Sequence, residues 1–297
     1  MARDQLVYDR VLEERYQSHP TRRGQFVELH KEFGRPVVTL FTSFRYPVML
    51  EDDDADMLEG VLRNLDLSDG LVLCISSPGG DGLAAERIVN MCRGYSGTGE
   101  YWALVPGKAK SAGTMVCFGA SKIIMGPTSE LGPIDPQFQE GPQLFSVFNV
   151  VQSYEDLFKR AVKEQGNLQP YLQQLANYDE REIAEMRAQL ALSEDIAARV
   201  LADGMMKGRT QKTILNKIKT FLTPERTKTH GRPIYRDEAA ACGLNVEMAD
   251  PDAQHWACVY DLYIRTSNFV QTEASKCIES GEHSYSTGVP LAPSQGG

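Results

Sequence analysis

Residues 71–88 read LVLCISSPGGDGLAAERI, and this stretch decides the expected fold. It begins with a continuous apolar run typical of a buried strand, passes through a glycine-rich turn and continues with apolar residues at helical spacing. Similar apolar runs predict further strands at 37–41, 101–105 and 122–125. Helices are expected over 54–65, 82–92 and 111–120. Strands that alternate with helices favour βαβ units, so we expect an α/β fold with a mainly parallel sheet.

The segments that flank this alternating region have a different pattern. Residues 1–35 are charged and helical in pattern, and a second helical block at about 150–222 interrupts the strands as an insertion. We therefore expect an N-terminal helical segment, a catalytic domain over 36–260 that contains the insertion, and a C-terminal helix and tail over 261–297. The tail from Glu279 onward is rich in turn-forming residues, which predicts disorder.

Composition and charge limit the function classes. The chain has 297 residues and a formal net charge of -9, which disfavours non-specific binding to nucleic acid or anionic lipid. It contains no apolar run of the ~20 residues that a membrane span needs, and its start lacks the apolar core of a secretory signal. The six cysteines are scattered without a C-x-x-C pair. We expect a cytoplasmic protein without disulfides, bound metal, a membrane anchor or a nucleic-acid partner.

The glycine turn allows two functional interpretations besides an ordinary turn. Gly80, Gly82 and Ala85 match the G-x-G-x-x-A spacing of a dinucleotide-binding turn. Glu100 lies at about the expected distance for the ribose-binding acid, but it precedes the next strand instead of following it, so we expect no cofactor. Alternatively, Gly79 and Gly80 expose backbone N–H donors that stabilise an oxyanion.

A serine stands at the next junction of strand and helix. Residues 105–114 read VPGKAKSAGT, and small Ala112 and Gly113 follow Ser111 at the start of the expected helix. A serine in this place is either an ordinary helix N-cap or a nucleophile held on a sharp turn. The segment alone leaves both interpretations open.

Four motifs in order resemble the Clp protease/crotonase superfamily: SSPGG, a helix and strand, KSAGT, and ASKIIMGPTSELGPIDPQ at 120–137. Within it the chain is most similar to the serine dehydrogenase proteinase family, relatives of signal peptide peptidase A. The resemblance covers about 36–140 and resumes at 229–246. It implies a spiral of ββα units that assembles with copies of itself and acts on peptide or protein substrates. It also implies that Ser111 is the nucleophile and that the N–H groups of Ala112, Gly79 and Gly80 form the oxyanion hole.

The general base is the least settled part of this expectation. In the Clp proteases a histidine follows the nucleophile, where this chain has Asp135, and an aspartate lies near the position that His230 occupies here. We therefore expect exchanged roles, with His230 as the base and Asp135 as its orienting carboxylate.

A serine–lysine dyad of the signal peptide peptidase kind is the alternative to this triad. The candidate bases are Lys110, beside the nucleophile, and Lys159 or Lys163 in the helical insertion. A lysine acts as a base only when burial lowers its pKa from about 10.4. The surroundings of Lys159 and Lys163 are polar, which favours a solvated helix face.

Three functions compete on these observations. The leading one is a serine peptidase that forms an acyl-enzyme on Ser111. The others are a crotonase-like enzyme acting on acyl thioesters and a catalytically silent oligomeric scaffold. The acidic run EDDDAD at 51–56 precedes a helix, where carboxylates interact favourably with the helix dipole, so we expect a helix start there and no metal site.

Overall fold

A seven-stranded sheet forms the centre of the protein in the computed structural model, which describes residues 6–13, 18–45, 48–141 and 143–288. The strand order is β10-β5-β3-β2-β1-β11-β12, and the first five strands in that order are parallel to their neighbours. Their bounds are β10 (Val246–Met248), β5 (Lys122–Met125), β3 (Tyr101–Val105), β2 (Leu71–Ser76) and β1 (Val37–Thr42). The predicted α/β fold with a mainly parallel sheet is confirmed.

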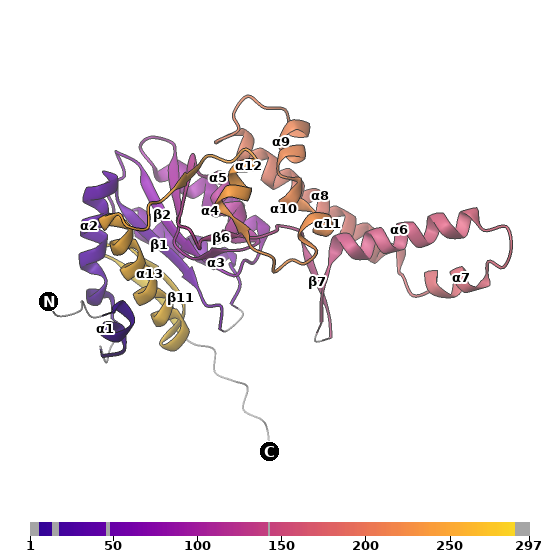
Figure 1. The fold of residues 1–297 in the computed structure, drawn as a ribbon, viewed down its shortest axis with the longest axis horizontal. Coiled ribbons are helices and arrows are strands. Elements are labelled where there is room, and N and C mark those ends of the chain that lie inside the picture. Colours follow the sequence, from indigo (N-terminus) through magenta and orange to yellow (C-terminus); the bar gives the residue numbers. More distant parts are fainter. Residues whose placement is uncertain (1–5, 14–17, 46–47, 142, 289–297) are drawn as a thin grey trace, which may run out of the picture.

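Helices cover both faces of this sheet, which explains the continuous apolar runs of its strands (Figure 1). Along β2, Leu71, Leu73 and Ile75 pack into one core, whereas Val72 and Cys74 pack into the other. The first core includes α3 (Asp52–Leu62), α4 (Gly82–Tyr95) and α5 (Ala112–Gly119); the second includes α2 (Arg23–Phe33) and α13 (Gln254–Thr272). A strand buried on both faces has no polar side, so its sequence shows no alternation.

Two smaller sheets lie outside the seven-stranded sheet. β4 (Lys108–Ala109), β6 (Glu130–Leu131) and β9 (Ile234–Tyr235) form a three-stranded sheet, and β9 leads into α12 (Arg236–Ala241). β7 (Gln137–Glu140) and β8 (Gln143–Ser146) form a hairpin. The sequence patterns did not distinguish this hairpin from a loop.

The helices of the predicted insertion form an arm that projects from the sheet and a second group that packs against the first core. Figure 1 shows α6 (Val147–Lys163) and α7 (Gln169–Leu175) projecting away from the sheet, with α8 (Glu180–Ala202) returning to it. Val147, Val151, Ile183 and Met186 form a separate small core within the arm. The chain continues through α9 (Gln211–Lys217), α10 (Lys219–Leu222) and α11 (Pro224–Thr227). Among the described helices, none is long and apolar enough to cross a membrane.

The N-terminal helices pack with α13 on the second face of the sheet, and the strands that follow α13 complete one edge of it. The N-terminal segment forms α1 (Val7–Glu13), the short 3-10 helix η1 (His19–Thr21) and α2. β11 (Ala274–Glu279) pairs antiparallel with β1 and β12 (Ser284–Gly288). The prediction of disorder from Glu279 is therefore wrong for residues 279–288, because backbone pairing to β11 orders a polar, exposed edge strand. Residues 289–297 lie outside the described residues.

Candidate active site

Ser111 occupies a strained bend between β4 and α5. Its backbone angles are φ 49° and ψ -119°, which for a residue with a side chain costs about 1–3 kcal/mol. The bend is held because the Lys110 N–H donates to the Ser77 carbonyl and the Gly113 N–H donates to the Lys110 carbonyl. The Ser111 side chain accepts no hydrogen bond from the helix it precedes. The hydroxyl is thus not an N-cap, and it faces a cavity instead.

The glycine turn lies directly against this serine. The Leu50 N–H donates to the Gly79 carbonyl at 2.7 Å, and the Asp81 N–H donates to the Leu50 carbonyl at 2.9 Å. Leu50 and Gly80 therefore form a parallel β-bridge in which Leu50 bonds to the residues before and after Gly80. In such a bridge the middle residue turns its own N–H away from its partner. Gly80 and Ala112 both line the cavity of Ser111, and in the described chain no hydrogen bond uses either N–H. The Gly79 N–H donates to Ser77 Oγ at 3.1 Å.

His230 and Asp135 are brought together although 95 positions separate them in the sequence. His230 Nδ1 lies 2.9 Å from Asp135 Oδ1, and Ser146 Oγ donates to Asp135 Oδ2 at 2.8 Å. The Asp135 side chain is fully buried, whereas that of His230 is 18% exposed. An ionised carboxylate only accepts hydrogen bonds, so with Asp135 ionised this contact is made by the His230 tautomer that carries its proton on Nδ1 and a lone pair on Nε2.

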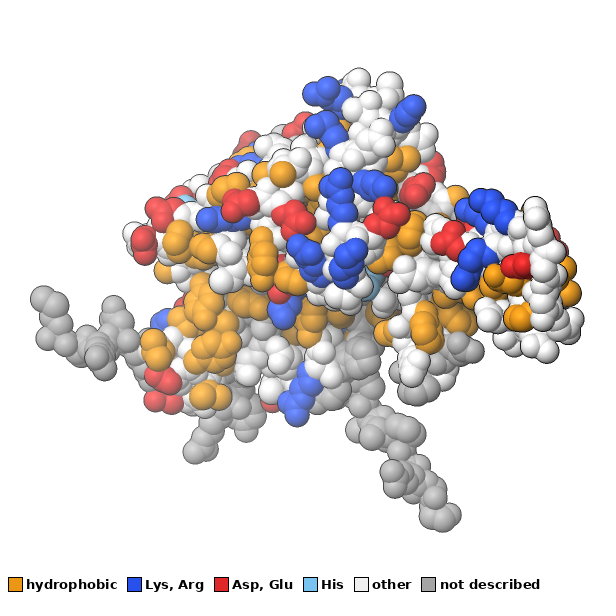
Figure 2. Space-filling model, turned by 45° about the vertical axis from the view of Figure 1, so that its right-hand side comes forward, with side chains coloured by type: hydrophobic (Ala, Val, Ile, Leu, Met, Phe, Trp, Pro, Cys, Tyr) orange, Lys and Arg blue, Asp and Glu red, His pale blue; other side chains and the backbone are white. Residues whose placement is uncertain are grey.

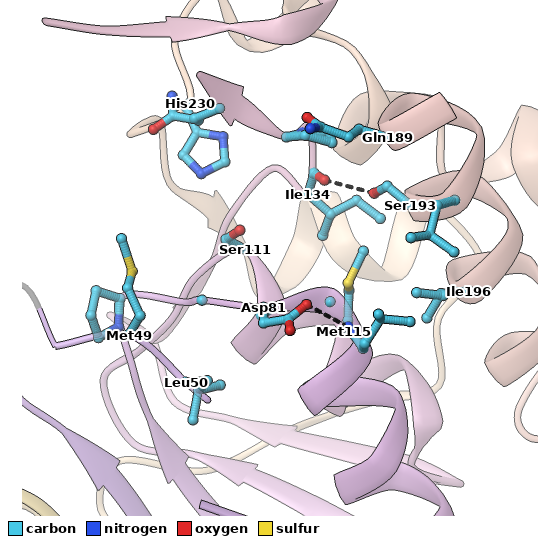
Figure 3. A pocket seen from close by; sticks show the side chains of 18 of the residues that line it. Met49, Leu50, Asp81, Ser111, Met115, Ile134, Gln189, Ser193, Ile196 and His230 are labelled. Atoms are coloured by element: carbon cyan, nitrogen blue, oxygen red, sulfur yellow. Dashed lines mark hydrogen bonds between the residues drawn. The ribbon is translucent and has the colours of Figure 1, made fainter. Parts of the chain in front are cut away.

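One cavity of about 580 Å³ is lined by Ser111, Gly80, Ala112 and His230. Figure 3 shows His230 on one side of Ser111, and within the described residues no hydrogen bond joins the two side chains. Catalytic contacts are often loose without substrate, so this geometry is compatible with proton transfer in a complex. The helix α8 supplies part of the wall, with Ser193 Oγ donating to the Ile134 carbonyl at 2.9 Å. The wall is mainly apolar, formed by Leu83, Met115, Ile134, Leu192 and Ile196.

The family of the chain follows from a comparison over most of its length. A family model described as "ClpP-like SDH-type serine proteinase" matches residues 37–272. The match includes the glycine turn, the serine bend and residues 228–233, which carry His230 and are called the histidine loop here. The chain belongs to this family. It is also 28% identical over 220 residues to the uncharacterized protein MJ0137 of Methanocaldococcus jannaschii. That match covers 74% of this chain and 65% of the archaeal protein.

The three lysines considered as bases do not line the cavity. Lys110 Nζ donates to the Glu130 carboxylate and to the Leu131 carbonyl, and burial lowers the pKa of Lys110 while Glu130 opposes that shift. Lys159 is 61% exposed and pairs with carboxylates of its own helix. Lys163 is exposed at the end of the same helix. The structure therefore brings His230, and none of these lysines, to the wall of the cavity.

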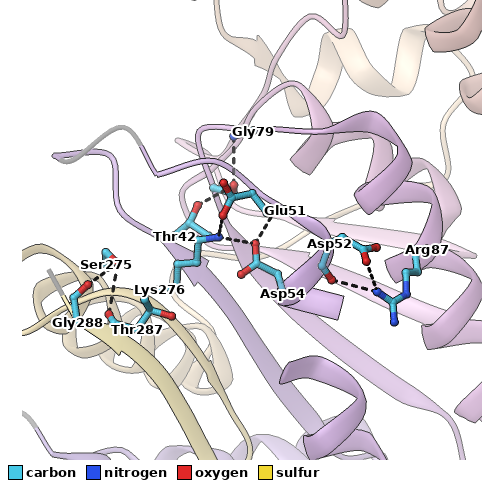
Figure 4. A network of polar contacts seen from close by, with 11 residues as sticks. Thr42, Glu51, Asp52, Asp54, Gly79, Arg87, Ser275, Lys276, Thr287 and Gly288 are labelled. Carbon is cyan, nitrogen blue, oxygen red and sulfur yellow. Dashed lines mark hydrogen bonds and ion pairs between the residues drawn. The ribbon is translucent and has the colours of Figure 1, made fainter. Parts of the chain in front are cut away.

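A polar network beneath the glycine turn fixes its position (Figure 4). Ser77 Oγ lies 2.8 Å from Thr42 Oγ1 on β1 and accepts the Gly79 N–H, so it ties the turn to the central sheet. Beside it, Lys276 on β11 donates to Glu51 at 2.8 Å and to Asp54 at 2.9 Å. Sequence reasoning did not single out Ser77, Thr42 or Lys276, although the paired serines of SSPGG were a visible signal for the first.

Gly79→Ala tests the close approach of turn and serine. Gly79 has φ +115°, and a Cβ at this position would lie 2.6 Å from Ser111 Cβ and 3.0 Å from the Lys110 carbonyl oxygen. We expect the substitution to lower the free energy of unfolding by about 2–4 kcal/mol and to reduce hydrolysis at least ~100-fold, because the bend must move. Chemical denaturation and a steady-state assay measure the two effects.

The control for this variant is Gly99→Ala. Gly99 also has a positive φ, +71°, but nothing lies within 4 Å of the added Cβ. It should cost about 1 kcal/mol of backbone strain and leave hydrolysis unchanged. Equal effects of the two variants would show that the contact with Ser111 does not matter.

Lys276→Met tests the ion pairs beside the turn. Asp54 is almost fully buried, and burial raises the pKa of its carboxyl group, while Lys276 opposes that rise. We expect the variant to lose about 3 kcal/mol at neutral pH, because a buried charge is left unpaired. Because the pKa of Asp54 is raised in the folded protein, the unfolded chain releases the Asp54 proton at a lower pH than the folded chain does. The stability lost through Lys276→Met should therefore be largest at neutral pH and shrink towards about pH 4, as Asp54 becomes protonated.

Denaturant unfolding at both pH values checks this expectation. Lys31→Met is the matched control, since Lys31 pairs with Glu28 on the surface, where both side chains are over 60% exposed. That variant should change stability by less than about 1 kcal/mol at either pH. A loss for Lys276→Met that does not depend on pH would contradict the assignment to Asp54.

The acidic run at 51–56 starts a helix, as its position predicted. Glu51 and Asp54 form a capping box at the N-terminus of α3, and Asp52 and Asp56 pair with Arg87. Across the described ranges, no group of three or more His, Cys, Asp or Glu side chains is arranged to hold a metal ion.

Proposed function

We propose that the protein is a serine peptidase that hydrolyses peptide bonds through an acyl-enzyme on Ser111. The observation that carries the proposal is one cavity lined by a strained serine, two unpaired N–H groups and a histidine oriented by a buried carboxylate. Membership in a serine proteinase family supports the general class. The role of each residue is our own assignment.

The first step is the attack of Ser111 Oγ on the carbonyl carbon of the scissile bond. His230 Nε2 takes the hydroxyl proton as the C–O bond forms, and the Asp135 carboxylate stabilises the resulting imidazolium. The negative charge that develops on the carbonyl oxygen is accepted by the N–H groups of Gly80 and Ala112. We narrow the oxyanion hole to these two donors because the Gly79 N–H already donates to Ser77.

Collapse of the tetrahedral intermediate breaks the C–N bond, and His230 gives its proton to the leaving amine. Water then attacks the ester carbonyl, His230 takes a proton from that water, and the carboxylic acid leaves as Ser111 regains its hydrogen. Every proton transferred in these steps passes between Ser111, His230, the leaving amine and water, and water supplies the oxygen atom of the new carboxylic acid. The N-terminus of α5 at Ala112 adds a favourable dipole for the anion in both halves of the reaction.

The wall of the cavity supports an apolar side chain next to the scissile bond. Met115, Ile134 and Ile196 are buried and uncharged, so an apolar side chain packs against this part of the wall without the cost of desolvating a charge. Assembly with copies of this chain stays a prediction.

Covalent labelling tests the proposal directly. A fluorophosphonate should add one adduct per chain, and peptide mapping should place it on Ser111. The Ser111→Ala protein should remain unlabelled. A crotonase-like site needs no nucleophilic serine, so an unlabelled wild-type protein that turns over acyl thioesters would reject the peptidase in favour of that alternative. An unlabelled protein without any turnover would favour the scaffold.

A further inference from the structure

A stripe of positive charge lies on the region between α8 and α12. Residues 207–232 contain eight Lys and Arg residues and one carboxylate, Glu225, although the whole chain has a net charge of -9. All eight side chains belong to exposed residues. The part on and before α9 consists of Lys207, Arg209, Lys212 and Lys217. The part near the histidine loop consists of Lys219, Arg226, Lys228 and Arg232, and we call the eight together the basic stripe.

Most of the basic stripe lacks partners of opposite charge. Lys219 pairs with Glu225 at 3.0 Å, and Arg232 donates to the Arg226 carbonyl. In the part of the chain that the structure describes, Lys219 is the only one of the eight that forms an ion pair, since Arg226 donates to the Thr220 hydroxyl and the others have no carboxylate partner. Figure 2 shows Lys and Arg side chains from the top of the molecule down to the centre of that face, with some Asp and Glu side chains among them near the centre. Such a concentration creates a positive potential that attracts acidic ligands.

The last two residues of the basic stripe lie in the histidine loop. Lys228 lies two positions before His230, and its φ of +66° makes it, with Ser111, one of two described residues other than glycine with a positive φ. A glycine would adopt this conformation with less strain. The chain thus keeps a cationic side chain two positions from a residue that lines the cavity, at a backbone position that disfavours any side chain.

Carboxylates lie at the other end of the cavity. Glu51, which pairs with Lys276, and Asp81 line the cavity with Leu50, and in the view of Figure 3 Leu50 lies on the far side of Ser111 from His230. A polypeptide that crosses Ser111 thus has carboxylates at one end and His230 at the other, where Lys228 and Arg232 are two positions from His230 in the sequence. This arrangement favours substrates with an acidic segment on the His230 side.

We propose that the basic stripe binds an acidic segment of the protein substrate and thereby holds a neighbouring bond at Ser111; this inference rests on the proposed peptidase function. Its continuity with the catalytic loop favours a substrate over a separate partner. Single-stranded nucleic acid is less suited, because stacking needs exposed aromatic rings. The only Phe, Tyr or Trp within residues 207–232 is Phe221, which is buried.

The test compares three peptides with the same apolar residue before the cleaved bond. One carries three glutamates before that bond, one carries them after it, and the third has glutamines at both places. For one of the two acidic peptides we expect kcat/KM about tenfold above that of the neutral peptide at low salt. The preference should vanish near about 1 M salt, where the Debye length is about 3 Å.

Two variants assign the preference to the stripe. Lys228→Glu with Arg232→Glu should abolish it, so that this variant cleaves the acidic and the neutral peptides with equal kcat/KM. Lys228→Gly should reduce the preference about threefold without lowering the unfolding midpoint, since glycine relieves the positive φ. The control Lys31→Glu with Arg63→Glu reverses two exposed charges elsewhere and should keep the preference. Equal kcat/KM for all peptides, or a loss in this control, would overturn the proposal.

Binding measurements separate failure of this inference from failure of the peptidase function. If no peptide is cleaved, the peptidase function fails. Anisotropy of the labelled acidic peptides with Ser111→Ala protein then still tests the stripe, and no binding above the neutral peptide overturns it. Tighter binding of a single-stranded oligonucleotide, or dissociation of an assembly on charge reversal at Lys228 and Arg232, would also overturn it in favour of those partners.

Discussion

Replacing Ser111 with alanine is expected to reduce kcat/KM for peptide hydrolysis by about 10^4–10^6-fold. The reason is that the variant removes the only nucleophile that the cavity offers to a bound carbonyl in our mechanism, while the Gly80 and Ala112 donors still bind it. Substrate binding should change little, and relief of backbone strain is not expected, because alanine also disfavours a φ of 49°. Steady-state kinetics with an apolar peptide and titration of binding measure the two effects.

Ser193→Ala is the matched control, because this second serine lines the same cavity. Its hydroxyl donates to the Ile134 carbonyl, so its loss should cost about 1 kcal/mol of stability. We expect its kcat/KM to stay within about tenfold of wild type. A Ser111→Ala protein as active as this control would remove the acyl-enzyme from consideration.

Replacing Asp135 with asparagine is expected to lower kcat by about 10^3–10^4-fold. The amide has nearly the same shape as the carboxylate, but it no longer fixes the proton on His230 Nδ1 or stabilises the imidazolium. KM should change much less than kcat, because Asp135 is buried behind the histidine and is not among the residues that line the cavity. His230→Ala should lose activity to a similar or greater degree.

Asp81→Asn provides the comparison for a carboxylate that lines the cavity without orienting a base. Asp81 caps α4 by accepting the Leu83 N–H at 2.9 Å, so its substitution should affect stability by less than about 1 kcal/mol. Its kcat should be nearly that of wild type. If Asp135→Asn behaves in the same way, the pair of Asp135 and His230 is structural, and another group activates Ser111.

The sequence was most informative where local patterns decide structure. The apolar runs at 71–76 and 101–105 predicted strands because both sheet faces are covered, and SSPGG with KSAGT identified the family. By contrast, β12 is polar and exposed, and its order depends on pairing with β11, which no local pattern encodes. The same limit applies to Ser146, whose contact with Asp135 exists only after the hairpin of β7 and β8 has formed.

The proposed partnership of His230 and Asp135 was inferred from a resemblance, and the structure supplies their contact distance. Spacing along the chain does not contain this information, because the arm of α6 and α7 intervenes between the two residues. The contribution of α8 to the cavity was likewise invisible, since Leu192 and Ile196 have the apolar spacing of any amphipathic helix.

The place of β11 in the sheet makes the support of the glycine turn depend on a contact that is distant in the sequence. β1 lies inside the sheet, yet one of its two neighbours is β11, at residues 274–279. Until β11 has been synthesised and has paired, β1 is an edge strand, and Thr42, which contacts Ser77 beneath the glycine turn, lies on that open edge. A fragment truncated before residue 274 would hold the serine bend without this support, so we expect Ser111 to be unreactive in such a fragment.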